Sequence, residues 1–172
     1  AATLFYVFVY TGWLKRSTSQ NIVIGGAAGS IPPLVGWAAI TGGLDLPALY
    51  LFAVVFFWTP PHFWALALLI QKDYERARIP MLPVVAGRQQ TVLHIFAYAV
   101  VLVALTLLFA TSSAVGWVYL GAAALLGGVF IGMAWQLKRQ STARQARKLY
   151  LYSLLYLALL FLVMIVDSTV GL

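Results

Sequence analysis

The chain has 172 residues, of which 63% are hydrophobic and only 9% are charged. A soluble domain carries about 25% charged residues, so this composition excludes a protein that is surrounded by water. There is no cysteine, which excludes disulfides, zinc–thiolate sites and thiol nucleophiles. The net charge of +7 would suggest nucleic acid in a soluble protein, but in so apolar a chain membrane topology is the first explanation. We therefore predict an all-α, polytopic transmembrane helix bundle.

Five apolar stretches are long enough to cross a hydrocarbon core of about 30 Å, and none contains Asp, Glu, Lys or Arg. They are residues 22–41, 48–70, 92–112, 114–137 and 149–166. The apolar start of the chain, up to about Leu14, is too short to span and is interpreted as the end of a preceding helix. We expect one transmembrane domain over residues 1–172 that is incomplete at its N-terminus.

All 11 Lys and Arg residues lie in three connections, which alternate with connections that carry none. The basic connections are residues 11–21, 71–91 and 138–148, and each is expected to be a long loop. By the positive-inside rule, these loops are cytoplasmic and the C-terminus lies outside. Topology and attraction to anionic lipid account for most of the basic residues in the last loop.

Two proline pairs interrupt the first two spans. Pro32–Pro33 and Pro60–Pro61 remove backbone donors and are expected to kink or break their helices. Carbonyl groups freed within a membrane need partners or water, so two neighbouring interrupted spans favour a cavity between them; a purely structural kink is the alternative. The Gly-x-x-x-Gly spacings Gly25–Gly29 and Gly128–Gly132 favour close helix packing.

Only one basic connection also carries carboxylates: Asp73 and Glu75 lie beside Lys72 and Arg76. A carboxylate among several cations suits a Mg²⁺-bound polyphosphate, because the metal takes oxygen ligands and the phosphates take Lys and Arg. On a helix, Asp73 and Arg76 would share a face at i,i+3, which favours Asp73 over Glu75 as the metal ligand. A simply solvated loop is the alternative. The other two carboxylates are on the outer side, where nothing else reactive collects.

His62 lies about eight residues inside its span, roughly 12 Å deep. There it is either functional or bonded to a carbonyl freed by the proline pair, and Trp58 shares its face. His94, near the start of the next span, is either an interfacial histidine or the second member of a pair that binds haem iron or handles protons. Asn21 ends the first basic loop, where its amide could meet a metal or phosphate or cap a helix.

Long blocks of the sequence resemble one protein family. The blocks include Tyr-Thr-Gly-Trp-Leu-Lys-Arg (10–16), the glycine-rich residues 20–37, Trp-Thr-Pro-Pro-His-Phe-Trp-Ala-Leu-Ala (58–67) and residues 72–85 with Ile-Pro-Met-Leu-Pro. They resemble the protohaem IX farnesyltransferases, or haem O synthases, a branch of the UbiA-type intramembrane prenyltransferases. The resemblance covers essentially the whole chain. It implies nine transmembrane helices around a cavity open to the membrane, and two Asp-bearing cytoplasmic loops that hold Mg²⁺ and a prenyl diphosphate. Asp73 matches the second loop, and the first loop is absent.

The resemblance also implies the reaction: a farnesyl group passes from farnesyl diphosphate to a vinyl group of haem B, making haem O. Mg²⁺ would be the cofactor. The partners would be the two substrates, the lipid bilayer of a bacterial plasma membrane and a membrane enzyme of the haem pathway, with no nucleic acid. The expected site residues are Asp73 as metal ligand and catalytic residue together with Lys72; Lys15, Arg16, Asn21 and Arg76 on the diphosphate; and His62, Trp58, Phe63, Trp64 and His94 in the haem and prenyl cavity.

Two positions depart from the pattern. Arg78 stands where the family usually has Gly before Ile-Pro-Met, and Ala77 takes the place of the second Asp of the wider superfamily's Asp-x-x-x-Asp, as is usual in the haem branch. Without the first Asp-rich loop, the fragment alone is expected to be inactive.

Three alternative functions are left open. A prenyltransferase for an aromatic quinone precursor is one alternative, and the Pro-Pro-His-Phe-Trp block argues against it. A transporter-like segment is another, but it predicts ionisable residues within the spans, where only the two histidines are found. A non-catalytic membrane fragment is the third.

Overall fold

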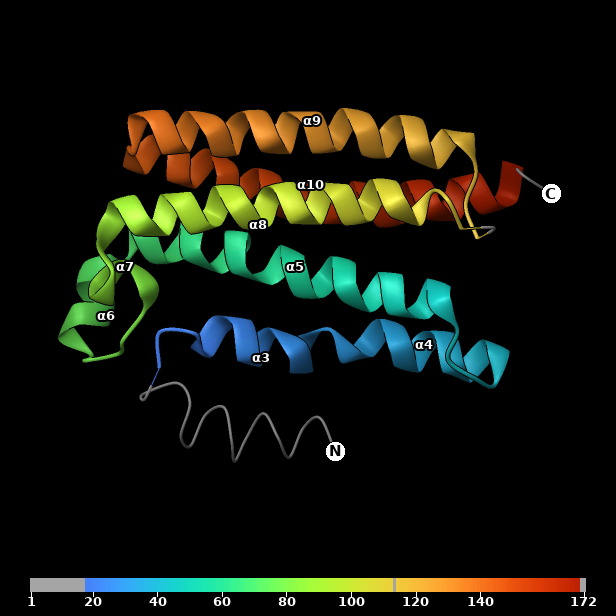
Figure 1. Cartoon of the computed structure of the whole chain (residues 1–172), viewed down its shortest axis with the longest axis horizontal. Coiled ribbons are helices and arrows are strands. Elements are labelled where there is room, and N and C mark those ends of the chain that lie inside the picture. The colour runs from blue at the N-terminus through green and yellow to red at the C-terminus, as the bar shows by residue number, and fades with distance from the viewer. Residues whose placement is uncertain (1–17, 113, 171–172) are drawn as a thin grey trace.

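A computed structural model of the chain describes residues 18–112 and 114–170 (Figure 1). All regular elements in these two ranges are helices, as the composition predicted. In chain order they are α3 (Asn21–Gly29), α4 (Ile31–Thr41), α5 (Leu46–Leu69), α6 (Gln71–Arg76), α7 (Leu82–Val85), α8 (Gly87–Phe109), α9 (Trp117–Gln140) and α10 (Ala143–Val170).

Five helical segments are long and apolar enough to cross a membrane, which confirms the five predicted spans. α3 and α4 together form the first, and α5, α8, α9 and α10 form the others. The 24 residues of α5 extend over about 36 Å at 1.5 Å per residue. The predicted end of a preceding helix, with Lys15 and Arg16, lies outside the described residues.

The long helices run side by side, and α5 lies at the centre of their contacts (Figure 1). It packs against α8 and α10, and also against α3 and α4, while α9 packs against α8 and α10. The largest fully buried side chains are aromatic: Trp64, Tyr119, Tyr156, Phe109 and Phe130. Many apolar side chains are exposed on the outer surface of the bundle. That exposure is not costly where the neighbour is lipid, because acyl chains are as apolar as leucine.

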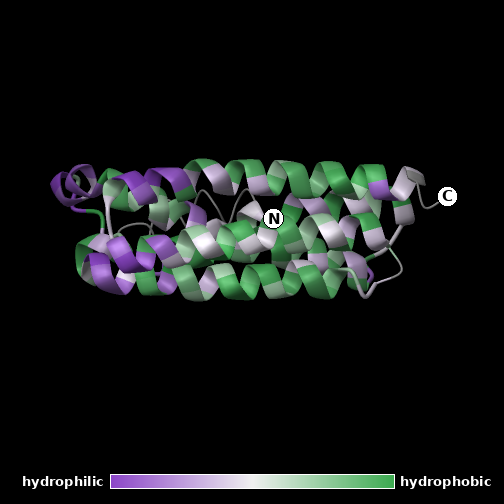
Figure 2. Cartoon of the chain, turned by 90° about the horizontal axis from the view of Figure 1, so that it is seen from above, coloured by the Kyte–Doolittle hydropathy of each residue, from purple (hydrophilic) through white to green (hydrophobic). Residues whose placement is uncertain are grey.

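Figure 2 shows that the hydrophilic residues gather mainly at one end of the bundle. Within the described part of the chain, every Lys and Arg lies where α5 and α9 end and where α8 and α10 begin. Asp45 and Asp167 lie at the opposite end, at the start of α5 and the end of α10. The predicted separation of basic and non-basic connections is therefore confirmed, while the side of the membrane that each end faces stays a prediction.

The expected long loop at 138–148 is wrong. α9 continues to Gln140 and α10 begins at Ala143, so only Ser141 and Thr142 connect them, with Ser141 in a left-handed conformation (φ 47°). Residues 87–91 are likewise the first turns of α8. Hydropathy reports where a helix leaves the hydrocarbon core, whereas the helix itself continues into water because its backbone hydrogen bonds are internal.

The two proline pairs behave differently. Pro32 and Pro33 lie in the first turn of α4, after a break at Ser30, where a missing N–H has no partner to lose. Pro60 and Pro61 are buried inside α5, which runs from Leu46 to Leu69 without interruption, so of the expected kink or break this pair causes no break. α5 packs against α3, α8 and α10, and neighbouring helices commonly allow a membrane helix to tolerate proline.

The glycines that allow close packing are only partly those expected. A Cβ at Gly26 would lie 3.1 Å from Thr59 Cγ2, so α3 approaches α5 closely there. In α9, a Cβ at Gly127 would lie 2.6 Å from Val103 Cγ1, whereas no atom of the described residues lies within 4 Å of a Cβ at Gly128 or Gly132. Gly127 therefore brings α9 onto α8, and the Gly128–Gly132 spacing makes no close helix contact within the described part of the chain.

Candidate active site

A cavity of about 490 Å³ opens at the basic end of the bundle, where α5 meets α6 and the first turn of α8. It is lined by Leu68, Leu69, Ile70, Gln71, Lys72, Asp73, Glu75, Arg76 and Arg88. The structure therefore brings together the predicted residues Lys72, Asp73 and Arg76. It adds Arg88, which the sequence analysis counted only toward topology.

Asp73 lies on the short helix α6, and its carboxylate is open. Its Oδ1 lies 3.8 Å from Arg76 Nη1, and the two side chains are 69% and 81% exposed. This confirms the predicted i,i+3 pairing. An exposed ion pair of this length contributes little to stability, so both groups can turn to a ligand at small cost.

Glu75 is held by its own helix. Gln71 Nε2 donates to Glu75 Oε1 at 2.8 Å and to the Pro83 carbonyl at 3.2 Å, which ties α6 to α7. One of its two acceptor oxygens is therefore engaged. This difference supports Asp73, rather than Glu75, as the carboxylate that is available to a metal.

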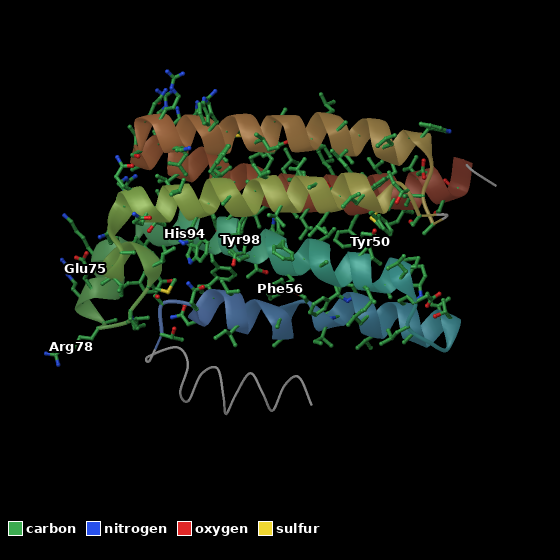
Figure 3. All side chains as sticks on the ribbon, in the orientation of Figure 1. Tyr50, Phe56, Glu75, Arg78, His94 and Tyr98 are labelled. Carbon is green, nitrogen blue, oxygen red and sulfur yellow. The ribbon has the colours of Figure 1, made fainter. Side chains whose placement is uncertain are left out.

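The C-terminus of α6 explains the position where this chain departs from the family pattern. Arg78 has φ 53°, in the left-handed region that favours glycine. Its N–H donates to the Glu75 carbonyl at 3.1 Å, and the Ile79 N–H donates to the Tyr74 carbonyl at 3.0 Å. These are the two bonds of a Schellman motif, which usually places glycine at this residue. Figure 3 shows the Arg78 side chain projecting away from the end of the bundle. Arg78 therefore adopts the glycine-like conformation itself.

Tyr74 supports this turn from the side of the core, against which it is partly buried. Burial raises the pKa of the Tyr74 hydroxyl above its usual value. The group is therefore neutral at physiological pH and adds no negative charge beside Asp73.

Arg88 is oriented by the end of another helix. Its Nε donates to the Ser141 carbonyl at the C-terminus of α9. Its Nη2 is buried and has no hydrogen-bond partner among the described residues. A guanidinium held through one nitrogen keeps donors for a second acceptor, so Arg88 is suited to an anion in this cavity.

A second, apolar cavity of about 220 Å³ lies between α3 and α5. Its lining comprises Ile22, Gly25, Gly26, Gly29, Val55, Trp58, Thr59 and Phe63. A cavity between the two proline-containing spans was predicted, and it is present. Trp58 and Phe63 are on its wall, as expected for residues that would surround an apolar substrate group.

His62 does not line either of these cavities. It is buried against α10, where its Nδ1 lies 2.7 Å from Ser153 Oγ. Its ring stacks on Trp58 and Tyr150, with centroid distances of 4.3 and 4.9 Å. The bond to a freed carbonyl that the sequence left open is thus replaced by a bond to a serine on another helix.

Trp64 and His94 also lie elsewhere, at the contact of α5 with α8. Trp64 is fully buried and meets His94 edge to face at 5.9 Å. His94 Nδ1 lies 2.8 Å from the Gln90 carbonyl, one turn earlier in α8. Figure 3 shows His94 and Tyr98 following each other along this helix. The structure therefore separates His94 from His62 instead of pairing them.

Asn21 is buried at the first position of α3. The cap residue is Gln20, so the helix-cap interpretation of Asn21 is wrong. Asn21 opens the same helix that supplies Ile22 and three glycines to the apolar cavity.

These features define a class: a multi-pass, all-helical integral membrane protein with a charged cavity at one end and an apolar cavity within the spans. The model of the UbiA prenyltransferase family matches residues 1–165, and the chain belongs to this family.

Relatives named "Protoheme IX farnesyltransferase" are similar over nearly the whole chain. The chain is 57% identical to the one from a Roseiflexus species over 99% of its own length and 32% of the relative. It is 54% identical to the one from Synechocystis over 96% of its length and 53% of the relative. The protein of this name from Deinococcus radiodurans is 53% identical over 99% of this chain and 56% of the relative. The chain thus spans about a third to a half of these relatives. No solved structure matches it.

Proposed function

We propose that this chain forms part of an enzyme that transfers a farnesyl group from farnesyl diphosphate to a vinyl group of haem B, making haem O. The observation that carries the proposal is the charged cavity, in which an open carboxylate, Asp73, lies among Lys72, Arg76 and Arg88. Membership of a prenyltransferase family and similarity to relatives named for this reaction support it. We also treat residues 1–172 as belonging to one prenyltransferase domain.

The donor groups of this cavity fit a magnesium–diphosphate complex. Mg²⁺ usually binds through one or two carboxylates and takes its other ligands from substrate phosphates and water. Within the described residues no group of three or more His, Cys, Asp or Glu residues could hold a metal. Asp73 would therefore hold Mg²⁺ jointly with the diphosphate, and the ion would supply positive charge that stabilises the leaving group.

The chain's own cations bind the diphosphate oxygens. Lys72 and Arg76 lie on the α6 side of the cavity and Arg88 on the α8 side, so they can stabilise the negative charge that develops as the allylic carbon–oxygen bond breaks. Lys15 and Arg16 are proposed as further ligands, and Asn21 as a contact at the start of α3.

The apolar cavity suits the other end of the reaction. An allylic cation must be kept from water until the haem vinyl group attacks it, and aromatic faces attract a cation. Trp58 and Phe63 line this cavity, so we assign them to the prenyl group. His62, Trp64 and His94 do not line this cavity, and we propose that they act on it through contacts within α5, α8 and α10.

The basic end would face the cytoplasm of a bacterial cell and the C-terminus the outside. A membrane enzyme of the haem pathway is proposed as a partner.

The test uses the complete protein in lipid nanodiscs with farnesyl diphosphate, Mg²⁺ and haem B. Mass spectrometry should detect haem O and equimolar diphosphate. In parallel, the 172-residue chain alone should bind Mg²⁺ and diphosphate weakly and show no turnover. Prenylation of a 4-hydroxybenzoate-type acceptor in preference to haem B would instead identify an enzyme for an aromatic quinone precursor. No consumption of farnesyl diphosphate with either acceptor would contradict the proposal.

A further inference from the structure

A cluster of aromatic and polar side chains from α5 and α10 holds the ring of His62 in a fixed plane. Trp58 and Tyr150 stack on the ring at interplanar angles of 17° and 27°, and Phe63 meets it edge-on at 5.3 Å. Trp58 Nε1 also donates to the Ser153 carbonyl at 2.7 Å, so the two helices are joined at this level. His62 is 7% exposed. An imidazole confined in this way keeps a constant hydrogen-bond geometry.

The hydrogen bonds of Ser153 determine which nitrogen of His62 carries the proton. Ser153 Oγ lies 2.6 Å from the Tyr150 carbonyl and 2.7 Å from His62 Nδ1. A hydroxyl has one proton, and a carbonyl can only accept. The Ser153 hydroxyl must therefore donate its hydrogen bond to the Tyr150 carbonyl, because two oxygens 2.6 Å apart with no proton between them would repel each other. Ser153 Oγ then accepts from His62, which requires the Nδ1–H tautomer.

The other nitrogen, Nε2, is consequently left with a lone pair. In a neutral imidazole one nitrogen donates and the other accepts. Nε2 makes no hydrogen bond in the part of the chain that the structure describes. It is also not fully enclosed by protein atoms. Two neighbours of His62, Trp58 and Phe63, line the apolar cavity. A polar acceptor at membrane depth is costly to maintain and is commonly functional.

We propose that Ser153 is a positioning residue that fixes His62 as the Nδ1–H tautomer. We further propose that a water molecule adds to the haem side chain after the farnesyl group is attached, and that His62 Nε2 accepts the proton of this water. This inference rests on the proposed function. As the allylic carbon–oxygen bond breaks, its electron pair leaves with the diphosphate, and the vinyl π electrons form the new carbon–carbon bond. The cationic carbon that results takes a water oxygen, and the water proton passes to Nε2. The imidazolium lies between the faces of Trp58 and Tyr150, which stabilise its charge, and it returns the proton to solvent.

The tautomer is tested directly by nuclear magnetic resonance of the complete protein, labelled with ¹⁵N-histidine, in nanodiscs. His62→Gln identifies the His62 signals by their loss. We expect a protonated Nδ1 and an unprotonated Nε2 in the wild type, and a shift toward the Nε2–H tautomer in Ser153→Ala. Ser168→Ala is the matched control, because Ser168 makes the same i−3 bond, to Ile165 at 2.8 Å, on an exposed face of α10. An Nε2–H tautomer in the wild type, or no change in Ser153→Ala, overturns the proposal.

The role in proton transfer is tested by product partition. For each variant, farnesyl diphosphate consumed is compared with hydroxylated haem product formed. His62→Gln should lower the hydroxylated product per diphosphate released roughly 100-fold, and Ser153→Ala roughly 10-fold. The KM for farnesyl diphosphate should not change. Ser153→Thr keeps the hydroxyl and should restore the ratio.

Three results would contradict this role. A parallel loss of diphosphate consumption and product, with lower thermal stability, would show that Ser153 is only structural. A haem absorption change that disappears in His62→Gln would show that Nε2 ligates the iron instead. If the wild type consumes no farnesyl diphosphate, the proposed function and the proton-transfer role both fail, while the resonance experiment still decides the tautomer.

Discussion

Asp73 and Asp167, at opposite ends of the same bundle, differ in exposure and in hydrogen bonding. At the end away from the basic residues, Asp167 is 6% exposed, and both of its carboxylate oxygens accept backbone hydrogen bonds at the start of α9: Oδ2 from the Gly116 N–H and Oδ1 from the Tyr119 N–H at 3.1 Å. At the basic end, Asp73 is 69% exposed, and its contact with Arg76 is 3.8 Å long.

The difference shows how a carboxylate's surroundings decide its use. Asp167, from the end of α10, neutralises the unsatisfied N–H groups and the positive dipole end of α9, so its acceptors are already engaged. Asp73 lines a cavity among cations, and both of its oxygens remain available to a ligand. The same residue type is therefore structural at one end and suited to catalysis at the other.

The comparison requires that the two ends face opposite sides of the membrane. A cysteine at Thr142 should react with an impermeant thiol reagent only from the cytoplasmic side, and a cysteine at Gly43 only from the outside. Both residues are exposed, and the chain has no native cysteine to interfere. This result is all-or-none, and labelling of both positions from one side would contradict the topology.

Asp73→Asn keeps the size of the side chain and removes its charge. In the complete protein, we expect turnover to fall by roughly 100-fold or more, while membrane insertion and thermal stability stay unchanged. Steady-state kinetics at saturating Mg²⁺ measures this. Glu75→Gln is the matched control, because Glu75 is on the same helix but is held by Gln71. Near wild-type activity in Asp73→Asn would end the assignment of the metal to this residue.

Arg88→Gln should raise the KM for farnesyl diphosphate roughly 10-fold, because a charge-assisted hydrogen bond contributes about 1.5–3 kcal/mol. Arg88→Lys should recover only part of this loss, since a lysine cannot hold the Ser141 carbonyl and a phosphate in the same fork geometry. Arg78→Gln is the control, because that side chain does not line the cavity. If Arg88→Gln and Arg78→Gln raised the KM for farnesyl diphosphate equally, the location of Arg88 in the cavity wall would not explain its effect.

Asp167→Asn should give the smallest change in activity and a measurable change in stability. An amide can accept from only one of the two N–H groups, so we expect a loss of about 1–2 kcal/mol, with kcat and KM unchanged for the folded protein. Thermal unfolding in detergent measures it. Asp45→Asn is the control: Asp45 is exposed and accepts from Trp37 Nε1 at 2.9 Å, so about 0.5 kcal/mol or less is expected. If Asp167→Asn lowered turnover more than it lowered stability, the contrast between a structural Asp167 and a catalytic Asp73 would be contradicted.

Much of the fold could be predicted because lipid imposes a simple rule. Backbone groups must be paired internally, so each of the five predicted spans is helical, and the basic residues of the described chain gather at one end of the bundle. The i,i+3 pair of Asp73 and Arg76 was also predictable, because both residues lie on one short helix. The predicted loop at 138–148 failed because hydropathy does not report where a helix ends in water.

What the sequence by itself determined was local: the spans, the separation of basic from non-basic connections, and the one basic connection that also carries carboxylates. The tertiary structure alone decided the contacts between helices. It brought Arg88 to the wall of the Asp73 cavity, placed Ser153 against His62, and seated Asp167 on the N-terminus of α9. It also kept α5 continuous through Pro60 and Pro61, and made Gly127 the point of close approach to α8. The physical reason is that periodicity places residues on one helix face, whereas the partner of that face depends on how the helices of all five spans pack at once.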